Sequence, residues 1–288
     1  SGTEQDPYKI TCAYDFKLID NNPAAYYEVV NDIDFLGEPF EGPKKAFKGS
    51  LDGKNHTLSN LCLVGGGLFG EVIDSVKITN LKLANPTLVM TSANANVAGI
   101  LANMMRGGMV DGEDDGSGNI QTIPIPALLS NVHVANPLIK GTDYNNIVGT
   151  LIGEGALYLD VNTCSVTDAV ISASAAQVGG LVGKSATSTN IHACLFTGEA
   201  EGRVVGGITS EVSSGEPVYN CHVDADLYSN YTIGGIVGFS GRSLISNCVV
   251  EGTLTLDATA TEGKVGGIVG EVETDATGTS TATLVENC

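Results

Sequence analysis

The chain has 288 residues, a formal net charge of −19 and a hydrophobic fraction of 42%, with 37 glycines and no tryptophan. The negative charge argues against nucleic acid and anionic membrane surfaces as partners, because both are polyanions. No apolar run reaches the ~18 residues of a spanning helix, so no membrane-spanning segment is expected. The polar opening Ser1-Gly-Thr-Glu-Gln-Asp6 is typical of the region after a removed export signal or lipid anchor.

The first element expected along the chain is a short helix. The segment Ala13–Asp20 places Tyr14, Leu18 and Ile19 at a spacing compatible with a helix that ends just before Pro23. This segment precedes the repeated units described below. It therefore belongs to an N-terminal lead rather than to the repeats.

Short strand patterns then alternate with turn signals. His56 follows one of these turns and is expected to help close it. A catalytic role for His56 is not favoured, since no motif places an acid or a nucleophile beside it. The expected strands are Tyr26–Val30, Ile33–Phe35 and Leu58–Val64, and the expected turns are Gly37–Pro43 and Asp52–Asn55.

From residue 66 onward a glycine-rich motif returns and divides the chain into units. Counted between aligned glycines, the steps are 32, 50, 31, 27, 28 and 32 residues, which is typical of a solenoid. Glycine is expected here because a missing Cβ lets backbones pack closely and because a corner can require a positive φ. The copies are Gly66-Gly-Leu-Phe-Gly70, Val97-Ala-Gly-Ile-Leu101, Ile147-Val-Gly-Thr-Leu-Ile-Gly153, Val178-Gly-Gly-Leu-Val-Gly183, Val205-Gly-Gly-Ile208, Ile233-Gly-Gly-Ile-Val-Gly238 and Val265-Gly-Gly-Ile-Val-Gly270, aligned on glycines 67, 99, 149, 180, 207, 235 and 267.

Cysteines recur in step with this motif. Cys164, Cys194, Cys221 and Cys248 follow the aligned glycines by 15, 14, 14 and 13 residues, and Leu81 follows Gly67 by 14. One inward position that accepts any mid-sized apolar side chain explains this spacing. Around this position, side chains alternate between the two faces of the strand with a period of two. The residues expected to face inward are Val166, Phe196, Val223 and Val250, and those expected to face outward are Ser165, Thr167, His222, Asp224 and Glu251.

The seven cysteines are read as buried thiols rather than as a disulfide or zinc framework. Their number is odd, their spacing follows the coil period, and no Cys-x-x-Cys pair exists. A ladder of small hydrophobic thiols is therefore favoured. Disulfides between neighbouring rungs stay open as an alternative, because stacked rungs lie within disulfide reach.

Each unit reads as short strands separated by turns, with no helical period. Strands of this kind stack as a parallel β-helix whose coils lie about 4.8 Å apart. A solenoid grows along one axis, so one β-helix is expected over residues 26–288. Its open end would expose a strand edge, and we assign residues 1–25 as the lead and cap that cover it.

Several of these segments resemble the GLUG motif of bacterial surface and secreted proteins. The similarity extends over roughly residues 26–288 and implies a right-handed parallel β-helix, a cell-surface or secreted location and an adhesin-like role. The residues that carry it are Gly179-Gly-Leu-Val-Gly183, Gly266-Gly-Ile-Val-Gly270, the pairs Asn220-Cys221, Asn247-Cys248 and Asn287-Cys288, and the upstream segments Asp32–Phe35 and Phe47–Leu61.

The step of 50 residues holds an insertion near residues 107–127, and solenoids often place function in such insertions. It contains Asp111, Glu113, Asp115 and Asn119, which resemble the start of a calcium loop of alternating oxygen ligands. The match fails at Thr122, where a bidentate glutamate would stand. We expect a solvated acidic loop without a cofactor, with calcium as the alternative.

Stacking also predicts an acidic outer face. With the coil register above, Asp224 and Glu251 lie about one rung apart, and Asp226 and Glu199 lie nearby. Paired carboxylates are the catalytic groups of glycosidases, so these four residues are the catalytic candidates of an enzyme hypothesis. Arginine is scarce and tryptophan is absent, so a solvated acidic face is favoured.

Tyr228 and Tyr231 flank a predicted turn and could offer rings to a sugar or a protein. The sequence thus favours a non-enzymatic, adhesin-like binding protein with an extracellular glycan or protein ligand. A polysaccharide-degrading β-helix enzyme and a rigid spacer in a longer surface protein stay open as alternatives. No motif names a catalytic triad, a phosphate loop or a metal.

Overall fold

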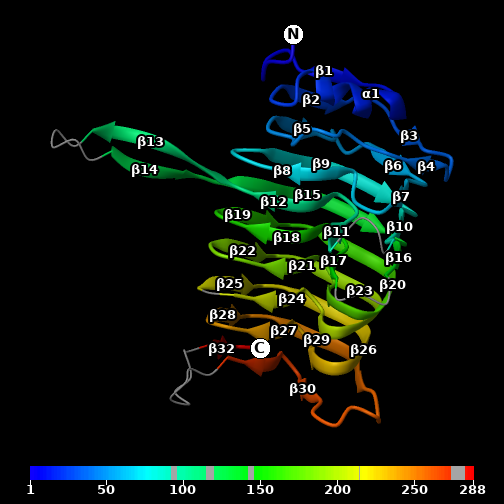
Figure 1. Ribbon diagram of the computed structural model, residues 1–288, viewed down its shortest axis with the longest axis vertical. Coiled ribbons are helices and arrows are strands. Elements are labelled where there is room, and N and C mark those ends of the chain that lie inside the picture. Colours follow the sequence, from blue (N-terminus) through cyan, green and yellow to red (C-terminus); the bar gives the residue numbers. More distant parts are fainter. Residues whose placement is uncertain (92–95, 115–119, 142–145, 214, 274–282) are drawn as a thin grey trace.

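The computed structural model shows β-strand coils stacked along one axis, with the N-terminus at one end and the C-terminus at the other (Figure 1). Strands of successive coils pair in parallel. This arrangement confirms the expected all-β parallel β-helix and the helix in its N-terminal segment. The structure describes residues 1–91, 96–114, 120–141, 146–213, 215–273 and 283–288.

The N-terminal end is covered by a strand and a short helix. Strand β1 pairs in parallel with β2, and α1 lies beside β1. The Asp15 carboxylate accepts hydrogen bonds from the backbone N–H groups of Thr11 and Cys12 at 2.7 and 3.2 Å, which fixes the first helical turn. The elements of this region are β1 (Tyr8–Ile10), α1 (Ala13–Leu18), the 3₁₀ turn η1 (Ile19–Asn21) and β2 (Tyr26–Val29).

The short helix buries a different set of side chains from the apolar residues that suggested it. Phe16 and Ile19 are fully buried, whereas Tyr14 and Leu18 are 62% and 41% exposed. Phe16 lies 6.0 Å from the ring of Phe35 on the first coil, measured between centroids. Phe16 and Ile19, which are three residues apart, therefore face the core, and Tyr14 and Leu18, which are four residues apart, face solvent. Within the described residues, neither helical segment has the length and hydropathy of a membrane-spanning helix.

The coils nearest the cap contain the expected short strands. The strand expected at Leu58–Val64 is divided, because Asn60 adopts a φ of 56° and bends the chain. His56 closes its turn as expected, with its Nδ1 3.1 Å from Oδ1 of Asp32 on the preceding coil. The strands here are β3 (Ile33–Asp34), β4 (Pro39–Phe40), β5 (Ser50–Asp52), β6 (Thr57–Ser59), β7 (Cys62–Val64), β10 (Thr87–Val89) and β11 (Val97–Gly99).

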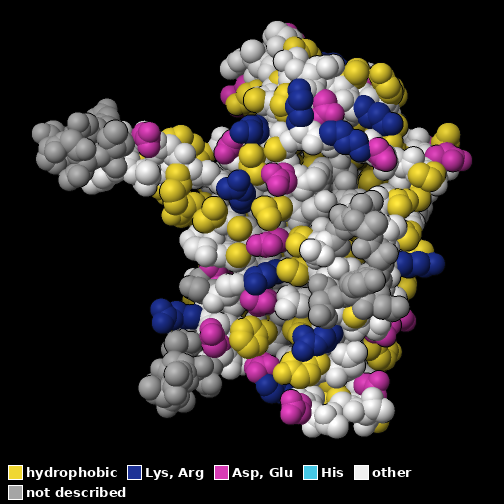
Figure 2. Space-filling model, in the orientation of Figure 1, with side chains coloured by type: hydrophobic (Ala, Val, Ile, Leu, Met, Phe, Trp, Pro, Cys, Tyr) yellow, Lys and Arg dark blue, Asp and Glu magenta, His cyan; other side chains and the backbone are white. Residues whose placement is uncertain are grey.

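One side of the solenoid is formed by the strands that follow the glycine motif. Each pairs in parallel with its equivalent on the next coil. In the space-filling view, acidic and basic side chains are interleaved down the visible face (Figure 2). The strands of this sheet are β8 (Phe69–Val72), β12 (Ala102–Arg106), β18 (Ile152–Ala156), β21 (Val182–Ser185), β24 (Thr209–Val212), β27 (Val237–Ser240) and β31 (Val269–Val272).

Two further strand sets complete each coil. The shorter set leads into the cysteine position, and the longer set begins at that position. The shorter strands are β19 (Leu159–Asn162), β22 (Thr189–His192), β25 (Glu216–Tyr219), β28 (Ser243–Ser246) and β32 (Leu284–Glu286). The longer set and its continuations are β9 (Lys77–Ala84), β15 (Ala127–Ala135), β16 (Leu138–Lys140), β17 (Ile147–Gly149), β20 (Ser165–Gly179), β23 (Leu195–Gly206), β26 (His222–Gly234), β29 (Val249–Leu256) and β30 (Lys264–Gly266).

The paired glycines are explained by close packing alone. A Cβ on Gly180 would lie 2.0 Å from the backbone oxygen of Gly207 on the next coil. Neither Gly180 nor its neighbour Gly179 has a positive φ, so the corner explanation was wrong. The coils approach so closely at this position that no side chain fits between them.

The alignment of the two divergent copies was wrong by one residue. Gly99 pairs with Gly149, and Gly149 pairs with Gly179, which is the first rather than the second glycine of its motif. Thr150 therefore occupies the second position. These copies contain one glycine of the pair, and the sequence does not show which of the two it is.

The cysteine column is confirmed as inward-facing. Cys164, Cys194, Cys221 and Cys248 are buried free thiols, whereas Cys12 and Cys288 are exposed and Cys62 is half-buried, so the prediction of buried thiols was wrong for these three. Each Sγ of the column donates to the backbone oxygen two residues earlier, at 3.1 to 3.4 Å. The residue before the cysteine turns the corner in the left-handed region, with a φ of 55° at Asn220, which explains the Asn-Cys pair of the motif.

The insertion forms an antiparallel hairpin that projects from the side of the solenoid (Figure 1). Its strands are β13 (Gly108–Asp114) and β14 (Ile120–Ile125). Met109, Val110 and Ile123 are 54%, 44% and 53% exposed, and hydrophobic side chains are visible near the base of the hairpin in Figure 2. The inserted segment is thus a strand pair rather than an irregular loop.

Candidate functional site

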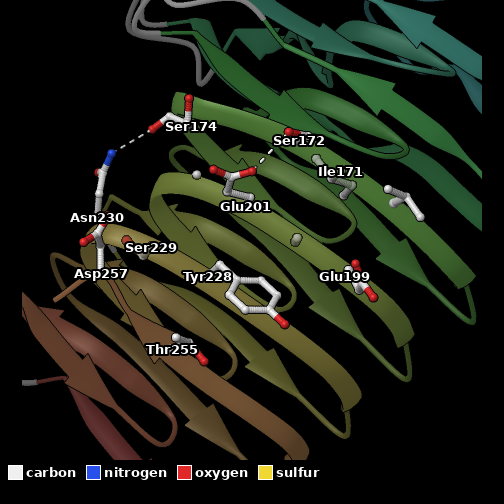
Figure 3. A pocket seen from close by; sticks show the side chains of 13 residues that line it. Ile171, Ser172, Ser174, Glu199, Glu201, Tyr228, Ser229, Asn230, Thr255 and Asp257 are labelled. Carbon is white, nitrogen blue, oxygen red and sulfur yellow. Dashed lines mark hydrogen bonds between the residues drawn. The ribbon is translucent and has the colours of Figure 1, made fainter.

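The longest strands lie side by side and form a groove. β20, β23, β26 and β29 pair in parallel, so each outward side chain lies one coil from its equivalent. The groove has a volume of about 630 Å³ (Figure 3). Its lining includes Ser172, Glu199, Glu201, Tyr228, Thr255 and Asp257.

Tyr228 lies in the middle of this groove (Figure 3). The strand register places Glu201 beside it on the preceding coil and Thr255 beside it on the following coil. The Tyr228 side chain is 39% exposed, and the Ser172 hydroxyl donates to Glu201 Oε2 at 3.1 Å. An aromatic ring with flanking carboxylate and hydroxyl groups is a surface on which a sugar ring can stack and hydrogen-bond.

A bend in β26 forms one end of the groove. The strand shifts its register against β23 at this point. The Ser229 hydroxyl donates to the backbone oxygen of Arg203 at 2.7 Å and accepts from the Tyr231 N–H at 3.1 Å. Asn230 Nδ2 reaches across to the backbone oxygen of Ser174 at 3.2 Å, as Figure 3 shows. These bonds hold the end of the groove in place.

The groove is acidic. Glu199, Glu201 and Asp257 contribute carboxylates, and none of its lining residues is a lysine, arginine or histidine. The backbone N–H and hydroxyl of Thr259 donate to Asp257 and lower the pKa of its carboxyl below the usual 3.8. Asp257 is therefore ionised at neutral pH, and its charge faces the groove.

The four carboxylates predicted from stacking lie in two register pairs on neighbouring coils. Asp224 pairs with Glu251, as expected, and Glu199 pairs with Asp226. Glu251 lies 3.0 Å from His222 Nε2, and Asp226 accepts a hydrogen bond from the backbone of β29. Glu199 alone of the four lines the groove. The predicted pair Asp224 and Glu251 lies on the outer face beside it.

The two predicted tyrosines lie in different places. Both belong to β26 rather than to a separate turn. The ring of Tyr231 is covered by Arg203, with Cζ 4.5 Å from the ring centroid, and Lys264 lies 5.9 Å away. Tyr231 lines a smaller hollow of about 290 Å³ together with Phe239. Only Tyr228 faces the main groove.

Of the four calcium candidates, only Asp111 has a side chain within the described residues. Asp111 is exposed on β13, opposite Thr122 of β14. Glu113 belongs to β13, and Asp115 and Asn119 lie outside the described residues. Within the described part of the chain, no cluster of three or more histidine, cysteine, aspartate or glutamate side chains could hold a metal ion.

Glu201, Thr255 and Asp257 line the groove but were not predicted as site residues. A usable signal was present, because residues 201, 228 and 255 are 27 apart and each lies 7 residues after a ladder cysteine. The cysteine period therefore already aligned Glu201, Tyr228 and Thr255. The predicted acidic residues lie three and five residues after the cysteines, whereas this column lies seven residues after them.

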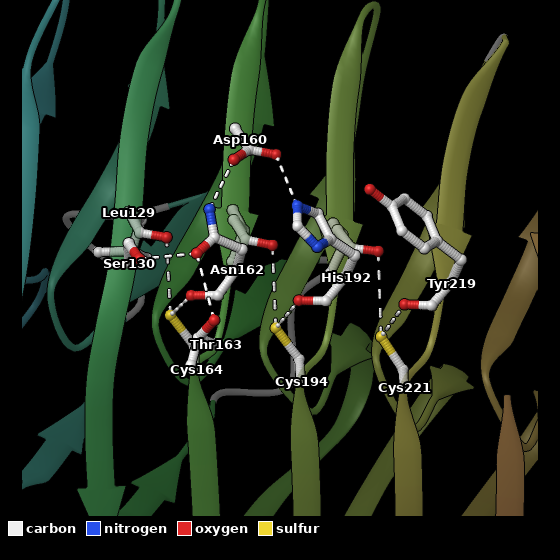
Figure 4. Close-up of polar contacts among 12 residues, drawn as sticks. Leu129, Ser130, Asp160, Asn162, Thr163, Cys164, His192, Cys194, Tyr219 and Cys221 are labelled. Atoms are coloured by element: carbon white, nitrogen blue, oxygen red, sulfur yellow. Dashed lines mark hydrogen bonds and ion pairs between the residues drawn. The ribbon is translucent and has the colours of Figure 1, made fainter. Parts of the chain in front are cut away.

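A second polar column runs beside the cysteines (Figure 4). Asp160 accepts a hydrogen bond from Asn162 Nδ2 at 2.6 Å and lies 3.1 Å from His192 Nε2. His192 in turn stacks on Tyr219. The contacts of His192 with Asp160 and with Tyr219 join neighbouring shorter strands, so the column stabilises the coil stack.

His133 and Ser165 form a serine–histidine contact between neighbouring coils. His133 Nδ1 lies 2.8 Å from Ser165 Oγ, and its Nε2 lies 2.8 Å from Asn131 Oδ1. Burial, with a smaller effect of Lys82, lowers the pKa of His133, which favours the neutral ring. However, Asn131 also donates to Asn80 on the preceding coil at 2.8 Å, and neither Ser165 nor His133 lines the groove. The contact therefore belongs to the hydrogen bonds that join neighbouring coils outside the groove.

Comparison with known proteins agrees with the repeat and the fold. Halomucin of Haloquadratum walsbyi is 31% identical over 162 residues, which are 47% of this chain and 2% of halomucin, so the chain spans a small part of that relative. A candidate immunoglobulin A1 protease from Bacteroides ovatus has a TM-score of 0.62 at 18% identity, over 99% of this chain and 84% of that one. A structure named IgA1 protease has a TM-score of 0.56 at 15% identity, over 93% and 22%. These structural likenesses establish the fold alone.

The family of the GLUG motif matches residues 229–255. These residues run from the end of β26 through most of β29, and they include Ser229, Asn230 and Thr255 of the groove. The resemblance seen in the repeated glycine motif is thereby confirmed. This chain is a parallel β-helix that carries a GLUG motif.

Proposed function

We propose that this protein is a non-enzymatic, adhesin-like binding protein that holds a glycan in the groove of β20, β23, β26 and β29. The position of Tyr228 carries the proposal. Its ring is exposed in the middle of the groove, with Glu201 and Thr255 in register on either side. Carbohydrate sites combine such a ring with nearby hydrogen-bonding groups.

A cell-surface or secreted location is part of the proposal. The similarity to halomucin and the GLUG motif support it. The repeated coils also suit a surface role, because a solenoid presents a long flank to a polymer. An export signal or lipid anchor ahead of this sequence stays a prediction.

Retention of polysaccharides in native gel electrophoresis tests the binding proposal. We expect the protein to bind intact polymers from a panel of host and plant polysaccharides. Tyr228→Ala should weaken retention at least about 5-fold, since an aromatic contact is worth ~1 kcal/mol. Tyr14→Ala is the matched control, because Tyr14 is 62% exposed on α1 outside the groove. Equal binding by both variants would refute the role of the groove.

A polysaccharide-degrading enzyme is the alternative function. Glu199 and Glu201 both face outward on β23 and lie two residues apart, so their Cα atoms are about 6.6 Å apart. Two carboxylates beside a bound sugar could act as acid and base. Shortening of the polymer in the same gel, abolished by Glu201→Gln, would favour this enzyme over the binding protein.

Two further outcomes of the same assay are informative. The neighbours bear protease names, so immunoglobulin A1 is included as a substrate, and its cleavage would contradict a non-enzymatic role. Failure to retain any polymer would favour the spacer alternative.

Calorimetry at millimolar calcium tests the hairpin, and the absence of heat would exclude the calcium loop at Asp111.

A further inference from the structure

The charges of the groove are uncompensated within the groove itself. Three carboxylates surround Tyr228, with Glu201 beside it in register and Glu199 and Asp257 on either side (Figure 3). The nearest basic residue in this column is Lys140, which pairs with Ser172, one coil before Glu201.

Lys140 does not line the groove. Its backbone lies two coil rises, or about 9.6 Å, from that of Glu201. Arg203 is directed to the ring of Tyr231, with Cζ 4.5 Å from the ring centroid. An anionic ligand in the groove would therefore meet three carboxylates and no lining cation.

The acceptor capacity of these carboxylates also favours a donor-rich ligand. Glu201 receives one hydrogen bond, from Ser172 at 3.1 Å, although a carboxylate offers about four acceptor positions. A protonated amine could donate charge-assisted hydrogen bonds to Glu201 and to Glu199. The face of Tyr228 would attract the same cation while it packs on the sugar ring.

We infer that the groove selects glycans that carry protonated amino groups, such as runs of 2-amino-2-deoxyhexose, and discriminates against acidic glycans. This inference rests on the proposed glycan-binding function. It differs from that function because it names the charge class of the ligand. The ligand amine lies against Glu201 and Glu199, and the adjacent sugar ring lies on Tyr228.

Titration calorimetry with three oligosaccharides of equal length tests the inference. The ligands are a glucosamine oligomer, the corresponding N-acetylglucosamine oligomer and a galacturonic acid oligomer, at about pH 5.5, where aspartate and glutamate are ionised. The first two share a backbone and differ in the charged amine. We expect the glucosamine oligomer to bind at least about 10-fold tighter, because a charge-assisted hydrogen bond is stronger than a neutral one. Added salt should reduce this preference.

Matched variants assign the preference to the groove. Glu201→Gln and Glu199→Gln should each weaken glucosamine binding by about 10-fold and leave N-acetylglucosamine binding nearly unchanged. Glu262→Gln makes the same charge change at an exposed residue outside the groove and should leave both affinities unchanged. Circular dichroism and the unfolding midpoint confirm that each variant is folded.

The possible results separate the two proposals. If the protein prefers the neutral or the acidic oligomer, the charge inference is overturned and glycan binding stands. If Glu262→Gln weakens binding as much as Glu201→Gln, the preference reflects the overall charge and the inference also fails. If none of the three oligomers binds and the polysaccharide panel is also not retained, the proposed function itself fails.

Discussion

His192 stacks on Tyr219 across two neighbouring coils, with ring centroids 4.7 Å apart and 3° between the ring planes. Parallel strands in register bring equivalent positions together, so the two rings lie one above the other (Figure 4). Removing one ring deletes this contact and leaves the other ring against solvent. Tyr219→Ala should therefore lower the free energy of unfolding by about 2 kcal/mol, measured by urea denaturation. Tyr14→Ala should change it little, and an equal loss in both would contradict a specific stacking contribution.

The buried thiols should resist alkylation in the native protein. The neighbouring thiol of Cys194, together with burial, raises the pKa of Cys221 from 9.0 to about 12. At pH 8 the thiolate fraction of such a group is about 10⁻⁴, and the thiolate is the reactive form. Iodoacetamide followed by mass spectrometry should modify the exposed Cys12 and leave Cys221 unmodified until urea is added. Rapid native modification of Cys221 would contradict the buried ladder.

The same pKa shift predicts loss of stability at alkaline pH. The folded pKa of Cys221 lies above the unfolded value of 9.0, so its stabilisation is fully present below pH 9 and decreases as the pH rises toward about 12. Each such group lowers the unfolding free energy by about 1.4 kcal/mol per pH unit in this window. The urea midpoint should fall between pH 8.5 and 10.5. Cys221→Val should show a smaller fall, because valine does not titrate.

Substituting the second motif glycine should be costly where another backbone lies against its α-carbon. A Cβ on Gly180 would lie 2.0 Å from Gly207 O and 2.5 Å from the Phe196 ring, whereas a Cβ on Gly267 meets nothing within 4 Å. Gly180→Ala should therefore cost about 3 kcal/mol or more, and Gly267→Ala should be nearly neutral. Thermal unfolding of both variants measures the difference. Equal tolerance would show that the coils can separate enough to accept a methyl group.

The projecting hairpin should be dispensable for folding. β13 and β14 pair with each other, and their exposed residues include Met109, Val110 and Ile123. Replacing residues 109–124 by Gly-Gly should leave the far-UV circular dichroism β-like and the unfolding midpoint close to that of the full chain. Loss of cooperative unfolding would show that the hairpin stabilises the coils. The apolar exposure also predicts that the shortened protein aggregates less.

The repeat spacing alone was enough to predict the solenoid and its inward column. Cys164, Cys194, Cys221 and Cys248 repeat because every coil must fill the same interior position, so the period reports the stacking directly. The alternation around them likewise showed which side chains face outward. A repeat carries this information locally, since each coil is built against a near copy of itself.

Features that depend on exact register or on several coils at once could be seen only in the folded chain. The position of Gly149 opposite Gly179 is set by backbone pairing, because one glycine fits either place in the motif. The groove gathers Glu201, Tyr228 and Thr255 from three different coils, and its shape depends on strand length and on the bend of β26. Charge and exposure of such a site arise only when the coils stack, and no single segment of the sequence contains them.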